Sequence, residues 1–203
     1  TPSEAFTRNS LSMMREQIRQ TYNHPSVILY GYMNEILIRM LSNKRLTEQQ
    51  RQQVADDTRS LALKLEALTK EEAPDRNTVM AIHYEDGYNK YEVSTIPDVL
   101  GYNLYFGWYY EQLEDLTRYL TSEHKRYPDR PIIVSECGAD ADLMNHSQFP
   151  RSWDYSEEYQ VVLHHSYLKQ FAQMPFLAGY ALWNFADFGA EARADATPWI
   201  NQK

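Results

Sequence analysis

Strand character is clearest in two stretches, Asn23-His-Pro-Ser-Val-Ile-Leu-Tyr-Gly-Tyr-Met-Asn-Glu35 and Pro131-Ile-Ile-Val-Ser-Glu136-Cys-Gly138. Each contains a short apolar run bounded by turn-forming residues, a pattern that predicts a buried strand. We expect these strands over 27–31 and 131–135. Three further runs, 78–82, 99–103 and 177–183, have the same character, so the sequence predicts five strands.

Helical patterns fill most of the spaces between these strands. Ser3 is a candidate N-cap for a helix over 4–22, and the capping box Thr47-Glu-Gln-Gln50 opens a helix that runs toward Ala73. Two more helices are expected over 110–127 and 156–173, and a polar loop is expected around 85–87. Strands that alternate with helices predict parallel βαβ units and the α/β class.

Polar residues at the ends of several strands favour a (β/α)8 TIM barrel over a doubly wound sheet, because barrel enzymes carry their functional groups at the carboxyl ends of the strands. Five strands do not close an eight-stranded barrel. We therefore expect residues 1–203 to be the C-terminal part of a barrel catalytic domain, about five βα units that lack the first strands. We also expect the N-terminal accessory domains of a parent protein to be absent from this chain.

Composition excludes two classes of protein. No apolar run approaches the roughly 20 residues that a membrane helix requires, so a membrane protein is not expected. The net charge is −8 and the basic residues are scattered, whereas nucleic-acid binding needs a concentrated Lys/Arg surface. The single cysteine, Cys137, excludes an internal disulfide. The N-terminus has no signal-peptide pattern, and the compartment stays open.

Glu35 and Glu136 each follow a predicted strand, 101 positions apart. Two carboxyl groups at strand ends fit glycosidic bond cleavage, in which one group protonates the leaving oxygen and the other attacks the anomeric carbon or activates water. An inverting hydrolase would hold its carboxyl groups about 6.5 to 9.5 Å apart. The alternative from another class is a noncatalytic carbohydrate-binding fragment.

Three ordered motifs resemble glycoside hydrolase family 2, whose members include β-galactosidases, β-glucuronidases and β-mannosidases. They are Asn23-His-Pro-Ser-Val-Ile with Asn34-Glu35, the Pro131 to Glu136 stretch, and Gly179-Tyr-Ala-Leu-Trp-Asn-Phe-Ala-Asp-Phe188. The resemblance implies a retaining mechanism with Glu35 as acid/base and Glu136 as nucleophile, their carboxyl groups about 5 to 5.5 Å apart.

The same resemblance implies roles for further residues. Asn34 would hydrogen-bond the sugar 2-hydroxyl, Tyr105 would donate a hydrogen bond to the nucleophile, and Trp183 would form a platform under the sugar. Tyr109 would line the pocket together with Trp108, although either could instead pack the start of a helix. His83 follows the strand over 78–82 and is a candidate contact to the glycone.

The prediction of the glycone depends on the C-terminal stretch Asn201-Gln-Lys203. This stretch resembles the Asn-x-Lys motif with which β-glucuronidases bind the sugar carboxylate, and an ammonium suits that charge. A similar stretch is common in β-galactosidase-like members, and the chain departs from the usual family pattern at Tyr30 and Met33. We expect the protein to be a β-galactosidase, and the alternative is a β-glucuronidase.

Metal and cofactor sites are not expected. His164 and His165 are adjacent on a predicted helix and so point in different directions, and no other cluster has metal-ligand spacing. The expected partner is a small-molecule or oligosaccharide glycoside, and the parent protein could be a homo-oligomer. Neither nucleic acid nor a membrane is an expected partner.

Overall fold

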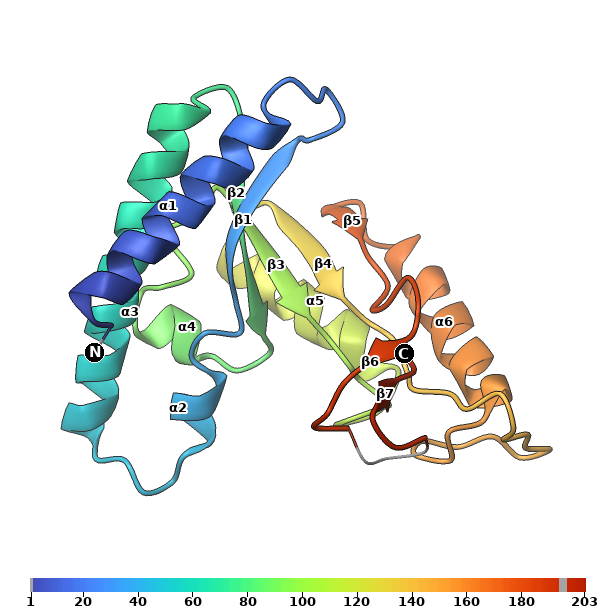
Figure 1. Ribbon diagram of the computed structural model, residues 1–203. Helices are drawn as coiled ribbons and strands as arrows, with labels where there is room; N and C mark the ends of the chain where they lie inside the picture. The colour runs from blue at the N-terminus through green and yellow to red at the C-terminus, as the bar shows by residue number, and fades with distance from the viewer. Residues whose placement is uncertain (1, 194–196) are drawn as a thin grey trace. The chain divides into compact units, whose positions relative to one another are not determined.

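The computed structural model describes residues 2–193 and 197–203 and has an α/β fold, as predicted (Figure 1). Five strands form one sheet whose order follows the chain, β1 (Leu29–Asn34), β2 (Asn77–His83), β3 (Val99–Asn103), β4 (Ile132–Glu136) and β5 (Leu177–Tyr180). Strand β1 pairs with β2, and β4 pairs with β5, both in parallel. The chain forms two compact units, which divide between Gly101 and Tyr102.

In the first unit, two long helices pack on each other and α3 packs on β1 (Figure 1). Helix α1 spans Glu4–Thr21 and α3 spans Glu48–Glu72. Their apolar faces meet β1 in a core formed by Met14, Ile18, Tyr30, Leu61, Leu65, Leu68 and Ala73. Burial of these apolar side chains is the main force that holds the helices on the strand.

Both predicted helix caps of this unit are present. The Ser3 side chain accepts a hydrogen bond from the Phe6 N–H, and Thr47 and Gln50 form a reciprocal capping box. At the other end of α3, the carboxylate of Glu72 accepts hydrogen bonds from Arg15 and Arg19 at 2.8 and 2.7 Å. Those two guanidinium groups lower the pKa of Glu72.

The bounds of the first strand and two short helices differ from the predictions for this unit. The first strand begins at Leu29, because the Val27 N–H closes a turn on the His24 carbonyl, and it continues to Asn34. Two short helices, α2 (Ile38–Ser42) and α4 (Gly87–Lys90), were not predicted, and α4 occupies part of the expected polar loop. Helices this short lack the repeated apolar spacing on which sequence prediction depends.

The second unit contains α5 (Asp115–Arg126), α6 (Glu157–Phe171) and a small antiparallel pair, β6 (Phe188–Gly189) and β7 (Ile200–Asn201). Helix α5 begins five residues later than predicted, because Glu111, inside the predicted range, has a φ of 54°, which a right-handed helix cannot contain. The preceding segment turns at Gly107, which has a φ of 78°. The Gly107 N–H bonds the Tyr110 carbonyl, and a Cβ at position 107 would lie 2.4 Å from the Leu113 side chain.

The last strand ends at Tyr180, before the predicted end at Trp183. Backbone hydrogen bonds nevertheless continue beside β4, from the Ala181 N–H to the Val134 carbonyl and from the Trp183 N–H to the Cys137 carbonyl. No helix in the described ranges is long and apolar enough to cross a lipid bilayer.

Candidate active site

Glu35 lies where the chain leaves β1. The pairing of β1 with β2 shifts register between Gly31 and Asn34, and Glu35 has a φ of 47°, in the left-handed region that non-glycine residues rarely adopt. Its N–H donates to the Ala81 carbonyl at 2.9 Å. A bulge followed by a left-handed residue redirects the side chains at a strand end. The half-buried Glu35 is therefore held by its backbone at the end of the sheet.

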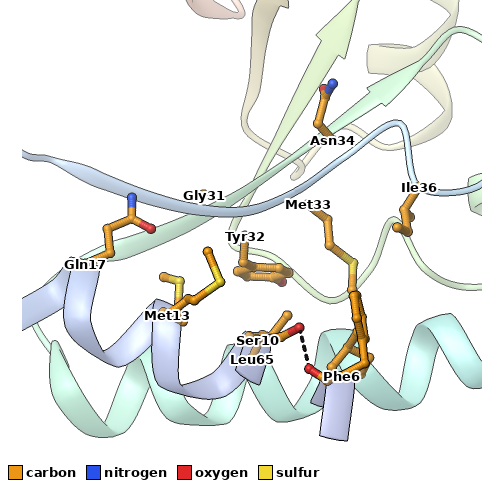
Figure 2. Close-up of a pocket in the computed structure, with 12 residues that line it drawn as sticks. Phe6, Ser10, Met13, Gln17, Gly31, Tyr32, Met33, Asn34, Ile36 and Leu65 are labelled. Atoms are coloured by element: carbon orange, nitrogen blue, oxygen red, sulfur yellow. Dashed lines mark hydrogen bonds between the residues drawn. The ribbon is translucent and has the colours of Figure 1, made fainter. Parts of the chain in front are cut away.

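Asn34, the preceding residue, is exposed at the last position of β1. Figure 2 shows its side chain on the side of the strand opposite to the helices, whereas Tyr32 and Met33 lie over α1 and α3.

His83 lies at the end of β2, inside a buried polar group. Its Nδ1 is hydrogen-bonded to the Tyr88 hydroxyl at 2.9 Å, and that hydroxyl also accepts the Leu37 N–H at 3.3 Å. Burial lowers the pKa of His83 to about 4, so its imidazole is neutral at pH 7. The His83 Nε2 is buried and has no hydrogen-bond partner among the described residues; Glu85 Oε1 lies 3.9 Å from it.

Glu35 interacts electrostatically with this group. The pKa of Tyr88 is raised mainly by burial, and the negative charge of Glu35 raises it further. Two of the predicted site residues thus both interact with Tyr88, His83 through a hydrogen bond and Glu35 through its charge.

Glu136 is the last residue of β4, not the residue after the strand. Its Oε2 accepts a hydrogen bond from the Tyr105 hydroxyl at 2.8 Å, and its carbonyl accepts the Leu104 N–H at 2.8 Å. One position earlier, the Ser135 hydroxyl donates to Asn103 Oδ1 at 2.7 Å. The ends of β3 and β4 are thereby tied together around the Glu136 carboxylate.

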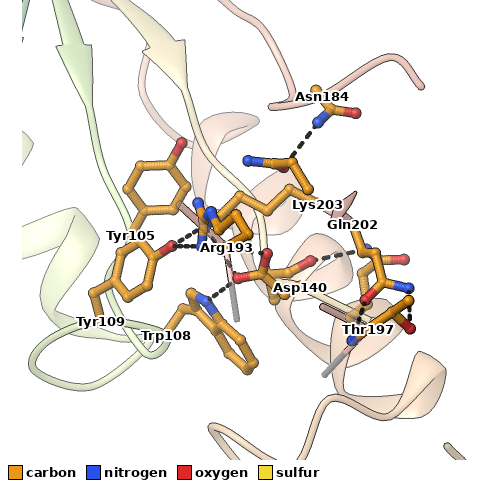
Figure 3. Close-up of polar contacts among 12 residues, drawn as sticks. Tyr105, Trp108, Tyr109, Asp140, Asn184, Arg193, Thr197, Gln202 and Lys203 are labelled. Atoms are coloured by element: carbon orange, nitrogen blue, oxygen red, sulfur yellow. Dashed lines mark hydrogen bonds and ion pairs between the residues drawn. The ribbon is translucent and has the colours of Figure 1, made fainter. Parts of the chain in front are cut away.

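Lys203, in the C-terminal segment, lies beside Tyr105 in the second unit (Figure 3). Its ammonium donates to the Tyr109 hydroxyl and to Asp140 Oδ2, the latter at 3.1 Å. It also lies over the rings of Tyr105 and Tyr109, 4.7 and 4.1 Å from their centroids, which are cation–π distances. The side chain of Lys203 is only 1% exposed.

Two charged residues complete this cluster. Asp140 Oδ2 accepts a second hydrogen bond from the Trp108 indole N–H at 2.8 Å. Arg193 Nη1 donates to the Tyr109 hydroxyl at 3.2 Å and lies 3.9 Å from Asp140 Oδ1. The Arg193 side chain is 26% exposed, so it is the more accessible of the two cations.

Asn184 joins the last-strand motif to the C-terminal motif. Its side-chain amide donates to Asn201 Oδ1 at 3.0 Å, and its backbone N–H donates to the Lys203 carbonyl at 2.7 Å. The peptide bond between Trp183 and Asn184 is cis. Trp183 is half-buried and meets the Phe188 ring edge-to-face. Asn201 therefore bonds another side chain of the protein, and Trp183 keeps part of its surface open.

A separate apolar cavity of about 480 Å³ lies between α1, β1 and α3 (Figure 2). Its lining includes Phe6, Met13, Tyr32 and Met33, and also Asn34, but contains no carboxyl group. It does not have the chemistry that glycoside hydrolysis needs. Within 2–193 and 197–203, no group of three or more His, Cys, Asp or Glu side chains could hold a metal ion.

The comparison with protein-family models shows the family to which the chain belongs. Residues 2–197 match the model for the TIM barrel domain of glycosyl hydrolases family 2. The chain belongs to glycoside hydrolase family 2. The predicted family and the predicted barrel fold are both confirmed.

Several family 2 relatives resemble the chain closely. A beta-glucuronidase of Bacteroides fragilis is 31% identical over 205 residues, covering 98% of this chain and 27% of its own length. The structure of Bacteroides uniformis beta-glucuronidase 2, covalently bound to cyclophellitol-6-carboxylate aziridine, matches 100% of this chain with 40% identity and a TM-score of 0.95; the match covers 24% of that protein. A putative beta-galactosidase from Bacteroides fragilis matches 97% of the chain with 29% identity and a TM-score of 0.78, over 28% of its own chain.

The chain therefore spans about a quarter of the length of these family 2 relatives. The comparisons favour β-glucuronidase, which was the alternative expectation, over β-galactosidase, which was the leading one. The roles predicted for individual site residues stay predictions.

Two members of the Lys203 cluster, Asp140 and Arg193, were not among the site residues predicted from the sequence. Asp140 lies only four residues after Glu136, and that proximity was a usable signal. Arg193 lies outside the three family 2 motifs, and only the fold brings it to Tyr109.

Proposed function

We propose that the protein containing this chain is a retaining β-glucuronidase, which hydrolyses terminal β-linked glucuronic acid. The observation that carries the proposal is the Lys203 ammonium, which lies over the Tyr105 and Tyr109 rings and donates to the Tyr109 hydroxyl, beside the Tyr105–Glu136 pair. A glucuronide differs from a neutral hexoside by a carboxylate, and a fixed ammonium is a suitable partner for that charge. The relative with the covalently bound 6-carboxylate ligand supports the same glycone.

In the proposed mechanism, the Glu136 carboxylate attacks the anomeric carbon while Glu35 donates a proton to the leaving oxygen. The glycosidic bond breaks and a covalent glycosyl-enzyme forms. Glu35 then removes a proton from water, which attacks the same carbon and releases the sugar and Glu136. The Tyr105 hydroxyl stabilises the ionised form of Glu136, because a hydrogen bond to a carboxylate favours its charged state.

The other predicted residues hold the sugar. Asn34 hydrogen-bonds the 2-hydroxyl, a contact that strengthens in an oxocarbenium-like transition state. Trp183 offers its partly open ring to the apolar face of the sugar. His83 is neutral and has a buried Nε2 that lacks a partner among the described residues, so this nitrogen can bond a glycone hydroxyl.

Lys203, the residue proposed to bind the carboxylate of the glycone, is covered by the protein. Because the Lys203 side chain is 1% exposed and donates to the Tyr109 hydroxyl, the ligand has to displace that hydroxyl to reach the ammonium. Tyr109 is 37% exposed, so a ligand can approach it from solvent. Asn201 fixes the turn of the chain through Asn184 and thereby supports Lys203.

The first test compares 4-nitrophenyl β-glucuronide and β-galactoside as substrates of the full-length protein. We expect the glucuronide to be preferred, and Lys203→Met to lower kcat/KM for it by roughly 100-fold or more, since a buried charge-assisted contact is lost. Lys169→Met, at an exposed position at the end of α6, is the matched control and should keep the preference. A preference for the galactoside in the unmodified protein would refute the proposal.

A second pair of variants separates an enzyme from a carbohydrate-binding protein. Glu136→Gln should lower the rate of hydrolysis by several orders of magnitude, because an amide cannot form the covalent intermediate. Glu35→Gln should retain slow attack on substrates with good leaving groups, and azide should accelerate its turnover because that anion needs no general base. Hydrolysis that persists in Glu136→Gln would remove Glu136 from the nucleophile role.

A further inference from the structure

Asp140 is a buried carboxylate in the loop after β4, and the proposed mechanism does not use it. It is 4% exposed. A buried carboxylate is costly unless it is paired and hydrogen-bonded. Asp140 Oδ2 accepts a hydrogen bond from the Trp108 indole N–H at 2.8 Å and is paired with the Lys203 ammonium at 3.1 Å (Figure 3).

The two partners differ in rigidity. Trp108 is 1% exposed and its indole stacks on Trp153, with ring centroids 5.1 Å apart. A lysine side chain is a flexible four-carbon stem with a rotatable ammonium. Asp140 therefore connects a rigid donor to a flexible one, and the fixed ring sets the position of the ammonium through the carboxylate.

The backbone around Asp140 is also tied to the C-terminal segment. The Ala141 N–H donates to the Gln202 carbonyl at 3.0 Å, and the Thr197 hydroxyl donates to Asp142 Oδ2 at 2.7 Å. These bonds keep the loop and Lys203 in register independently of Asp140. Loss of the Asp140 carboxylate would consequently release the ammonium without detaching the chain end.

The charges of the cluster suit a single carboxylate ligand. Lys203 and Arg193 each contribute one positive charge and Asp140 one negative charge, so one positive charge remains. When a ligand displaces the Tyr109 hydroxyl, Asp140 is the buried carboxylate that still holds the ammonium, above the Tyr105 ring. The Lys203 nitrogen has three donors, and one bond to Asp140 leaves the others for the ligand.

We propose that Asp140 is a positioning residue that fixes the Lys203 ammonium for the carboxylate of a uronic acid and thereby sets selectivity for uronides over neutral glycosides. This inference rests on the proposed function. Its readout is the ratio of kcat/KM for the β-glucuronide to kcat/KM for the β-galactoside, because general damage to the protein lowers both values together.

The experiment measures this ratio in the full-length protein for Asp140→Asn, Lys203→Met and the double variant. Asp140→Asn keeps the side-chain size and an acceptor for Trp108, and it should lower the ratio at least about tenfold. In the Lys203→Met background the same change should alter the ratio less than about twofold, since residues that act through one another are not additive. An unchanged or increased ratio in Asp140→Asn, or an equal fall in both backgrounds, would overturn the inference.

Two further variants keep the result interpretable. Asp142→Asn changes the same loop without touching Lys203 and should keep the ratio, whereas an equal fall there would assign the effect to loosening of the loop. Asp140→Glu keeps the buried charge pair if Asp140→Asn does not fold. It should lower the ratio at least about threefold, because the longer side chain moves the ammonium, and an unchanged ratio would contradict positioning.

The outcomes separate this inference from the proposed function. Loss of glucuronide preference in Lys203→Met with no effect of Asp140→Asn would leave the β-glucuronidase proposal standing and overturn only the role of Asp140. A galactoside preference in the unmodified protein would overturn both.

Discussion

The hydroxyl of Tyr105 donates a hydrogen bond to Oε2 of Glu136 across 2.8 Å. Tyr105 is 7% exposed and follows β3 in the chain, and Glu136 ends β4. The Tyr105 ring also lies beneath the Lys203 ammonium. One side chain therefore contacts the proposed nucleophile with its hydroxyl and the proposed carboxylate anchor with its ring face.

Tyr105→Phe should lower kcat by roughly 10- to 100-fold, the loss expected when a hydrogen bond to a charged group is removed. The ring face is kept, so the preference for a glucuronide should stay unchanged. Steady-state kinetics on both nitrophenyl substrates measure the two effects. Tyr127→Phe, at the end of α5, is the control. A wild-type kcat in Tyr105→Phe would show that the hydroxyl does not assist Glu136.

Gly138→Ala should displace the chain around Trp183. A Cβ at position 138 would lie 2.6 Å from the Trp183 carbonyl oxygen, a distance at which the backbone has to shift. We expect a lower midpoint of thermal unfolding and a fall in kcat/KM of about tenfold or more, because a small misplacement of a binding group is costly. Gly179→Ala is the matched control, since a Cβ there meets nothing within 4 Å. Equal behaviour of the two variants would contradict the expected clash.

Cys137 should be unreactive in the folded protein. Burial raises the pKa of its thiol to about 12, and the thiolate is the reactive form of cysteine. Iodoacetamide at pH 8, followed by mass-spectrometric mapping of the peptide that contains Cys137, should show labelling only after urea is added. Rapid labelling of that peptide in the native protein would be incompatible with the buried position.

His83 should make stability depend on pH in the acidic range. Its pKa is lowered from 6.5 to about 4 in the folded protein, so below pH 6.5 the unfolded chain takes up a proton that the folded chain does not. The free energy of unfolding should therefore decrease as the pH falls from 6.5 to 4, by up to about 3 kcal/mol from this group.

The midpoint of thermal unfolding at pH 7.5 and pH 5 measures this effect. His83→Gln cannot take up the proton and should show a smaller decrease between the two pH values than the unmodified protein. His165→Gln, at an exposed position on α6, should show the unmodified decrease. An identical decrease in all three proteins would argue against a buried neutral His83.

The features that the sequence predicted correctly are those that depend on residues close together in the chain. The caps at Ser3 and Thr47 are present because capping joins residues three positions apart. All five strands were found, since each contains a short apolar run bounded by turn-forming residues. The start of α5 was missed because the backbone adopts left-handed φ angles at Gly107 and Glu111, which the apolar spacing of the sequence does not reveal.

The sequence alone determined the five strands, their alternation with helices and the ordered motifs that carry Glu35 and Glu136, because these are local patterns. The tertiary structure alone decided what surrounds Lys203. Tyr109 and Asp140 lie 94 and 63 positions away from it in the chain, and Trp108 reaches it only through Asp140. Contacts over such separations form only when the folded backbone brings the groups together and burial excludes the water that would otherwise solvate them.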